Sequence, residues 1–123
     1  MPSIAIIGAS QDRNKFGNKA VRVFADKGFK VYPIHPKLSE IEGHKAYASI
    51  LQVPEKELDM VSFYLPPHVG MQVIEEVAKI DCKEVWFNPG SESDELVAKA
   101  EKLGLNVIQA CSIVGVGVSP NRY

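Results

Sequence analysis

The strongest constraint on the fold of this chain is a regular alternation of short β-rich runs with amphipathic helical segments. The first run, residues 3–8, is almost continuously apolar, which is typical of a strand buried on both faces of a parallel sheet. Further β-rich runs are expected at 29–34, 59–65, 84–88 and 106–110, with helices near 18–27, 69–78 and 96–103. Strand–helix alternation implies right-handed crossovers, so it predicts an α/β fold with a Rossmann-like, doubly wound sheet of about five parallel strands.

The remaining segments are harder to assign. Residues 41–53 are mixed in character, with one short helix expected before Pro54. Ser91 and Ser93 are both candidate caps for the helix that follows them. The last dozen residues are rich in glycine and valine, and no helix or strand is predicted for them.

Length and charge limit the organisation and the partners of the chain. Its 123 residues suffice for one hydrophobic core, so a single domain over residues 1–123 is expected. The formal net charge is −1, which favours neither nucleic acid nor an anionic membrane as a partner. The N-terminus lacks the pattern of a signal peptide, and the two cysteines form no disulfide framework. A cytoplasmic protein is the simplest expectation.

In a doubly wound fold the ligand crevice lies at the carboxyl ends of the strands, and the first such end carries an anion-site pattern. Gly8 directly follows the first strand and permits a sharp turn, while Gly17 lies at the start of the next helix. The helix N-terminus offers unpaired N–H groups, and Ser10, Arg13 and Lys15 offer further donors to phosphate. The dinucleotide fingerprint Gly-x-Gly-x-x-Gly is absent, and a loop glycine with two solvated basic residues is the alternative.

The end of the second strand reads Ile34-His35-Pro36-Lys37 and contains no acid. A site for NAD usually presents an acidic residue there to the ribose diol. Basic residues at this position suit a phosphorylated ribose, as in NADP or in coenzyme A. Taken singly, His35 and Lys37 are more often surface residues than ligands.

The third and fourth strands end in Leu65-Pro66-Pro67-His68 and Asn88-Pro89-Gly90. These residues leave few side-chain donors and form a stiff, apolar rim, which suits the pantetheine arm of coenzyme A better than a charged substrate. Prolines and glycines are also common in ordinary loops, so the same residues are explained equally well without a ligand. His68 begins a helix, where a positive charge is disfavoured, so it is expected to be a neutral rim residue and not a catalytic base.

No catalytic or metal-binding set is visible in the sequence, and an enzyme is therefore not expected. The three histidines and two cysteines have no metal-ligand spacing, and there is no Gly-x-Ser-x-Gly elbow or Walker loop. Cys111 follows the fifth strand and would face the crevice, where it could meet a ligand thiol, even as a mixed disulfide. A small buried apolar role for Cys111 is the more common outcome.

Taken together, these segments resemble the coenzyme A-binding domain family. The segments that carry the resemblance cover almost the whole chain: 6–10 with Arg13, Lys15 and Gly17; 28–36; 41–43 with Tyr47; 85–90; and 110–111. The family includes small stand-alone proteins and the N-terminal domains of the succinyl-CoA synthetase α subunit and of NDP-forming acyl-CoA synthetases. In those large synthetases the phosphorylated histidine and the ATP-grasp machinery lie in other domains, so the resemblance implies binding without acyl-CoA synthesis.

The resemblance also implies roles for individual residues. Gly8, Ala9, Ser10, Arg13 and Lys15 would hold the phosphates, residues 34–37 would meet the adenosine end, and the apolar rim with Cys111 would line the pantetheine path. The family often has asparagine where this chain has His35. The complete set of candidate binding residues is Gly8, Ala9, Ser10, Arg13, Lys15, Phe16, Gly17, Ile34, His35, Pro36, Lys37, Leu65, Pro66, His68, Asn88, Pro89, Gly90 and Cys111.

The functional prediction is therefore a protein that binds coenzyme A or an acyl-CoA as a carrier, sensor or regulatory module. With its pyrophosphate on the first helix, Arg13→Ala is expected to weaken binding by about 1.5–3 kcal/mol. Two alternatives stay open at this point: an NADP-binding, reductase-like domain, and a partner-binding regulatory subunit with a vestigial site. Association with a second copy or another protein is also left open.

Overall fold

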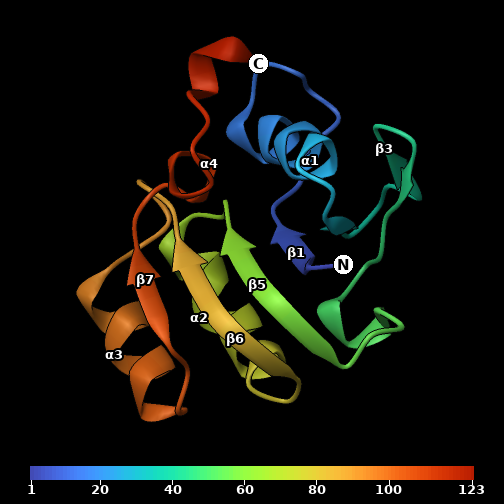
Figure 1. Ribbon diagram of the computed structural model, residues 1–123. Coiled ribbons are helices and arrows are strands. Elements are labelled where there is room, and N and C mark those ends of the chain that lie inside the picture. Colours follow the sequence, from blue (N-terminus) through green and yellow to red (C-terminus); the bar gives the residue numbers. More distant parts are fainter.

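The computed structural model describes residues 1–123, and its centre is one parallel five-stranded sheet (Figure 1). The strand order is β2-β1-β5-β6-β7, and every neighbouring pair is parallel. The strands are β1 (Ser3–Ile7), β2 (Lys30–Ile34), β5 (Glu57–Phe63), β6 (Asp81–Phe87) and β7 (Val107–Gln109). The predicted doubly wound sheet of five parallel strands is confirmed.

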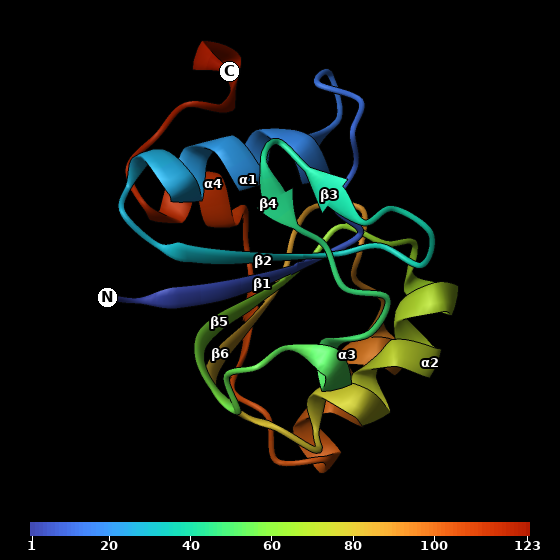
Figure 2. The same cartoon turned by 90° about the vertical axis from the view of Figure 1, so that its right-hand side faces the viewer.

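Helices cover both faces of this sheet (Figure 2). The helices are α1 (Phe16–Asp26), α2 (Pro67–Val77), α3 (Asp94–Lys102) and the short α4 (Ser112–Gly115). Ile4 and Ile6 of β1 pack with residues of α1 and α4, whereas Ala5 and Ile7 pack with residues of α2 and α3. Successive residues of β1 thus enter opposite cores, which is why the run is continuously apolar. Each fully buried isoleucine contributes about 1.5–3 kcal/mol to folding.

Helix α1 begins at Phe16, two residues before the expected start at Asn18, because an exposed Phe16 and a glycine give its first residues no amphipathic pattern. The side chain of Asn18 is fully buried, so it belongs to the inner face of the helix. Phe24, in the last turn of the helix, is also fully buried. Gly28 follows with a φ of 84° and allows the chain to turn back towards β2.

The segment between β2 and β5 holds a hairpin that the sequence did not predict. Strands β3 (Glu40–Ile41) and β4 (His44–Lys45) pair antiparallel. Each strand is too short to show an alternation of polar and apolar residues, so the sequence gives no strand pattern here. The short helix expected before Pro54 is confirmed as a 3-10 turn, η1 (Ile50–Gln52). Its cap is Ser49, whose Oγ accepts a hydrogen bond from the N–H of Leu51 at 3.1 Å.

The unassigned tail closes the core on the α1 side of the sheet. Ile113 of α4 is fully buried there, and Val118 beyond it is nearly so. A last 3-10 turn, η2 (Pro120–Arg122), ends the chain. None of the helices has the length and apolar character needed to span a membrane.

Candidate functional site

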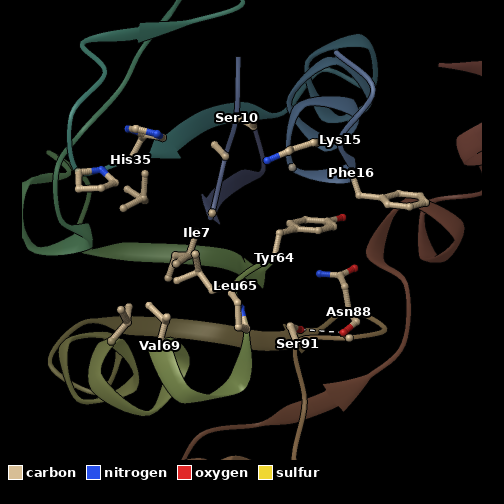
Figure 3. Close-up of a pocket in the computed structure, with 18 of the residues that line it drawn as sticks. Ile7, Ser10, Lys15, Phe16, His35, Tyr64, Leu65, Val69, Asn88 and Ser91 are labelled. Carbon is tan, nitrogen blue, oxygen red and sulfur yellow. Dashed lines mark hydrogen bonds between the residues drawn. The ribbon is translucent and has the colours of Figure 1, made fainter. Parts of the chain in front are cut away.

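A single large cavity of about 1170 Å³ opens at the carboxyl edge of the sheet (Figure 3). This volume exceeds the usual 300–1000 Å³ or so of a pocket for a drug-sized ligand, so the cavity can hold an extended molecule. Residues that follow β1, β2, β5, β6 and β7 all contribute to its wall. All but three of the eighteen predicted residues line it: Gly8, Ala9, Ser10, Lys15, Phe16, Gly17, Ile34, His35, Pro36, Leu65, Pro66, Asn88, Pro89, Gly90 and Cys111.

The three predicted residues outside the cavity wall are Arg13, Lys37 and His68. The guanidinium of Arg13 forms an ion pair with Glu42 of the hairpin at 3.0 Å, beside a separate, smaller depression. Lys37 and His68 are exposed, and each is next in sequence to a residue of the wall, Pro36 and Val69 respectively. The structure therefore leaves Lys15 as the one basic residue, apart from His35, that borders the cavity.

Two glycines set the shape of the loop between β1 and α1. Gly8 has a φ of 90°, and a Cβ there would lie 2.9 Å from the backbone carbonyl carbon and oxygen of Tyr64. A Cβ on Gly17 would lie 2.3 Å from the carbonyl oxygen of Gly8, well inside van der Waals contact. The start of α1 thus packs directly on the end of β1, and neither position has space for a side chain.

The start of α1 is chemically suited to bind an anion. Its first turn contains no acidic residue, and no side chain caps it. The N–H groups of Phe16 and Gly17 donate to no protein acceptor. The amine of Lys15 forms no ion pair with any carboxylate of the chain, and Figure 3 shows the Lys15 and Phe16 side chains at the start of α1. Unpaired N–H groups, the positive end of a helix and a free amine together favour a phosphate.

Asn18 fixes the loop in this conformation, a role that the sequence analysis missed. Its buried Nδ2 donates to the carbonyl oxygen of Ser10 at 2.9 Å and to the carboxylate of Glu42 at 3.1 Å. Its Oδ1 accepts from Nε of Arg22 at 2.8 Å. The sequence carries no direct signal for this role, because the burial of Asn18, which obliges its amide to find partners, appears only in the structure.

His35 is oriented by the backbone that follows it. Its Nδ1 accepts hydrogen bonds from the N–H groups of Lys37 and Leu38, both at 3.0 Å. An asparagine side-chain oxygen commonly makes the same kind of bond in a turn, so histidine can replace asparagine here without loss of the turn. Because Nδ1 is the acceptor, the neutral ring carries its proton on Nε2.

One part of the cavity wall was not predicted at all. It is a slot between η1 and α2, and we use the word slot for the following six residues: Ala48, Ser49, Ile50, Val69, Val73 and Glu76. Most of its wall is apolar. Sequence reasoning missed it because residues 48–50 reach the cavity through a connection of irregular structure. The periodicity of α2 also marks Val69 and Val73 simply as core.

A buried polar network lies behind the cavity wall at Tyr64 and Asn88. The hydroxyl of Ser112 lies 2.9 Å from that of Ser62 and 3.0 Å from that of Tyr64. The amide of Asn88 donates to Ser62 Oγ at 2.8 Å and to the carbonyl of Phe63 at 2.8 Å, and it accepts from the N–H of Ser112 at 2.8 Å. The side chain of Asn88 is thus committed to holding α4 against the sheet. Burial raises the pKa of Tyr64 to about 12.

The two cysteines have different surroundings. Cys111 immediately precedes α4, borders the cavity and is half-buried with a free thiol. Cys82 is also free but lies on β6 away from the cavity, where burial raises the pKa of its thiol.

Ser93, and not Ser91, caps α3, since Ser93 Oγ accepts from the N–H of Leu96 at 3.1 Å. No cluster of three or more potential metal ligands is present.

Fold and cavity together define a doubly wound α/β protein with one large site at the carboxyl edge of its sheet. The model of a family described as "CoA binding domain" matches residues 2–117. The chain therefore belongs to the CoA-binding domain family.

Two kinds of relatives match this chain. A conserved hypothetical protein from Pyrococcus furiosus is 37% identical in structure-based comparison, with a TM-score of 0.84 over 94% of this chain and 99% of its own. An ADP-forming acetate–CoA ligase II α subunit from the same organism is 31% identical over 85% of this chain but only 25% of its own length. The ADP-forming acetate–CoA ligase of Methanocaldococcus jannaschii is 42% identical over 63% of this chain and 11% of its own.

The chain thus corresponds to one domain of the ligases and spans at most about a quarter of the length of these curated relatives. The relatives that match over most of both aligned chains are small proteins. One of them is the uncharacterised YneT of Bacillus subtilis, which is 24% identical over 77% of its length.

Proposed function

We propose that this protein binds coenzyme A, free or acylated, in the cavity at the carboxyl edge of its sheet and serves as a carrier, sensor or regulatory module. The observation that carries the proposal is the pairing, within one cavity, of an anion-binding helix start with a long apolar wall. Coenzyme A combines those two chemistries, because its pyrophosphate is joined to a purine nucleoside on one side and to pantetheine on the other.

In the proposed arrangement the pyrophosphate lies against the N–H groups of Phe16 and Gly17, close to the amine of Lys15. Adenosine extends past His35 and Pro36 towards the slot. Lys37, outside the cavity wall but exposed beside it, can reach a phosphate on the ribose from solvent. Arg13 can join the phosphates only if it leaves Glu42.

Pantetheine would run in the opposite direction. Leu65, Pro66, Pro89 and Gly90 offer it an apolar path, and the thiol would end near Cys111. The residues at this end do not include a base paired with a nucleophile, so we propose binding without catalysis. Two free cysteines suit a reducing cytoplasm.

The test is isothermal titration calorimetry of the reduced protein against coenzyme A, ADP and NADPH. The proposal expects micromolar binding of coenzyme A, weaker binding of ADP and no heat with NADPH, because only coenzyme A fills both the phosphate end and the pantetheine path. Comparable affinity for NADPH would instead indicate a site for NADP. Absence of heat and of thermal stabilisation with coenzyme A would refute the proposed ligand.

A further inference from the structure

Glu76 is the one acidic side chain on the wall of the cavity. It lies on α2 in the slot and is half-buried. The four ion pairs of the protein do not include it, whereas the neighbouring Glu75 lies 3.7 Å from the amine of Lys99. A carboxylate on a largely apolar wall with no cationic partner favours a ligand group that donates hydrogen bonds.

The orientation of this carboxylate is fixed by Ser49. The hydroxyl of Ser49 donates to Oε1 of Glu76 at 2.5 Å, and the same hydroxyl is held by the N–H of Leu51 at 3.1 Å. The second carboxylate oxygen, Oε2, has no hydrogen-bond partner in the protein. One oxygen is therefore anchored and the other is free for a ligand.

The charges along the cavity give the ligand a direction. Lys15 and the unpaired N–H groups of α1 attract phosphate, whereas Glu76 repels it. The phosphates of a bound nucleotide therefore belong at the α1 end, and the nucleoside belongs in the slot. Ile50, Val69 and Val73 provide apolar surface there for a flat ring. Figure 3 shows Val69 across the cavity from the Ser10 and Lys15 end.

We propose that Glu76, held by Ser49, selects a 6-aminopurine as the base of the bound nucleotide. The exocyclic amine of adenine donates a hydrogen bond to the free Oε2. A 6-oxopurine presents a carbonyl oxygen in the same place, and two acceptors that face one another repel. This assignment rests on the proposed function and names the residue pair that determines base specificity within that site.

The test compares coenzyme A with deamino-coenzyme A, in which hypoxanthine replaces adenine, by calorimetric titration. The wild-type protein is expected to bind coenzyme A about 10- to 100-fold more tightly, the range for one hydrogen bond to a charged group. In Glu76→Gln this ratio should fall to about threefold or less, because the amide can offer either its oxygen or its NH₂ to the base. Glu75→Gln is the matched control, and it should retain the wild-type ratio.

A second variant, Ser49→Ala, tests the anchoring. Without the serine hydroxyl the carboxylate can rotate away, so the ratio should fall by less than in Glu76→Gln. Thermal melts of all variants establish that they are folded. Equal affinities of the wild-type protein for the two ligands would overturn this assignment while leaving coenzyme A binding intact. So would an affinity ratio in Glu76→Gln that equals the wild-type ratio. A wild-type protein that binds neither ligand would overturn the proposed function as well.

Discussion

Polar groups are paired with one another at the amino end of the parallel sheet and are left unpaired at its carboxyl end. At the amino end, the carboxylate of Asp59 accepts from the N–H of Ser3 at 2.8 Å and pairs with the amine of Lys83 at 3.1 Å. At the carboxyl end, the N–H groups at the start of α1 and the amine of Lys15 have no acidic partner. Polar groups that pair with one another stabilise the fold, whereas polar groups left unpaired beside a cavity are available to a ligand.

The largest effect is expected from adding a methyl group where the carboxyl end is most closely packed. Gly8→Ala should lower the free energy of unfolding by about 2–5 kcal/mol, since it combines a positive φ with a clash against the backbone of Tyr64. Gly28→Ala is the matched control, because Gly28 has a similar φ of 84° but no atom within 4 Å of the added Cβ. It should cost about 1–2 kcal/mol.

Urea denaturation measures both values, and titration with coenzyme A then tests the site. Gly8→Ala should lose binding, and Gly28→Ala should keep it. Equal stability losses in the two variants would mean that the contact between Gly8 and Tyr64 does not shape this end of the sheet.

Tyr64 should make the carboxyl end sensitive to alkali. Burial raises its pKa from the ordinary 10.0 to about 12, so the folded state holds the phenolic proton more tightly than the unfolded state does. Its contribution is fully present below pH 10 and is lost as the pH rises from 10 to 12, by up to about 2–3 kcal/mol. Tyr64→Phe should therefore reduce the alkaline loss of stability.

Tyr32 provides the comparison for this titration. Its pKa is also raised to about 12, first by burial and then by the neighbouring Glu55, but it does not border the cavity. Urea denaturation between pH 9 and pH 12 should show that each Tyr→Phe variant removes a separate part of the alkaline loss of folding stability. An unchanged pH dependence in Tyr64→Phe would contradict the assignment.

Basic residues near the loop should differ in their effect on ligand affinity. Lys15 borders the cavity with a free amine, so Lys15→Ala should weaken coenzyme A binding by about 10- to 30-fold, or about 1.4–2 kcal/mol. Arg13 is paired with Glu42 outside the cavity wall, so Arg13→Ala should have a smaller effect than Lys15→Ala. Lys27→Ala, at the far end of α1, is the control and should bind normally. A larger loss in Arg13→Ala would show that Arg13 moves to the phosphates when ligand binds.

The smallest effect is expected at the amino end. The N–H of Ser3 and the amine of Lys83 lower the pKa of Asp59 below its ordinary 3.8. The stability that Asp59 contributes is present above that value and is lost as the pH falls through the lowered pKa. Asp59→Asn should cost about 0.5–1 kcal/mol at pH 7, since the carboxylate is partly solvated. The difference from wild type should vanish at low pH, and coenzyme A affinity should not change.

Sequence reasoning predicted the sheet well because buried parallel strands leave a direct signal. The apolar run of β1 serves two cores at once, and Gly8 marks its end. The crevice was predictable for the same reason, since strand ends converge at one edge of such a sheet.

The site was predicted less completely because several contributions depend on tertiary contacts between distant segments. Arg13 is close in sequence to the anion loop, yet Glu42 of an unpredicted hairpin engages it. Ser49 and Glu76 are 27 residues apart, and only the packing of η1 on α2 joins them. Asn88 was identified by its place after β6, but its side chain is used to fix α4.

The most direct test of the central claim is a titration of ¹⁵N-labelled protein with coenzyme A, followed by amide chemical shifts. We expect the largest shifts on the N–H groups of Phe16 and Gly17, with smaller shifts along the slot. Amides at the amino end, such as Ser3 and Lys83, should remain unchanged. Shifts confined to the amino end, or no shifts at saturating ligand, would contradict a coenzyme A site at the carboxyl edge of the sheet.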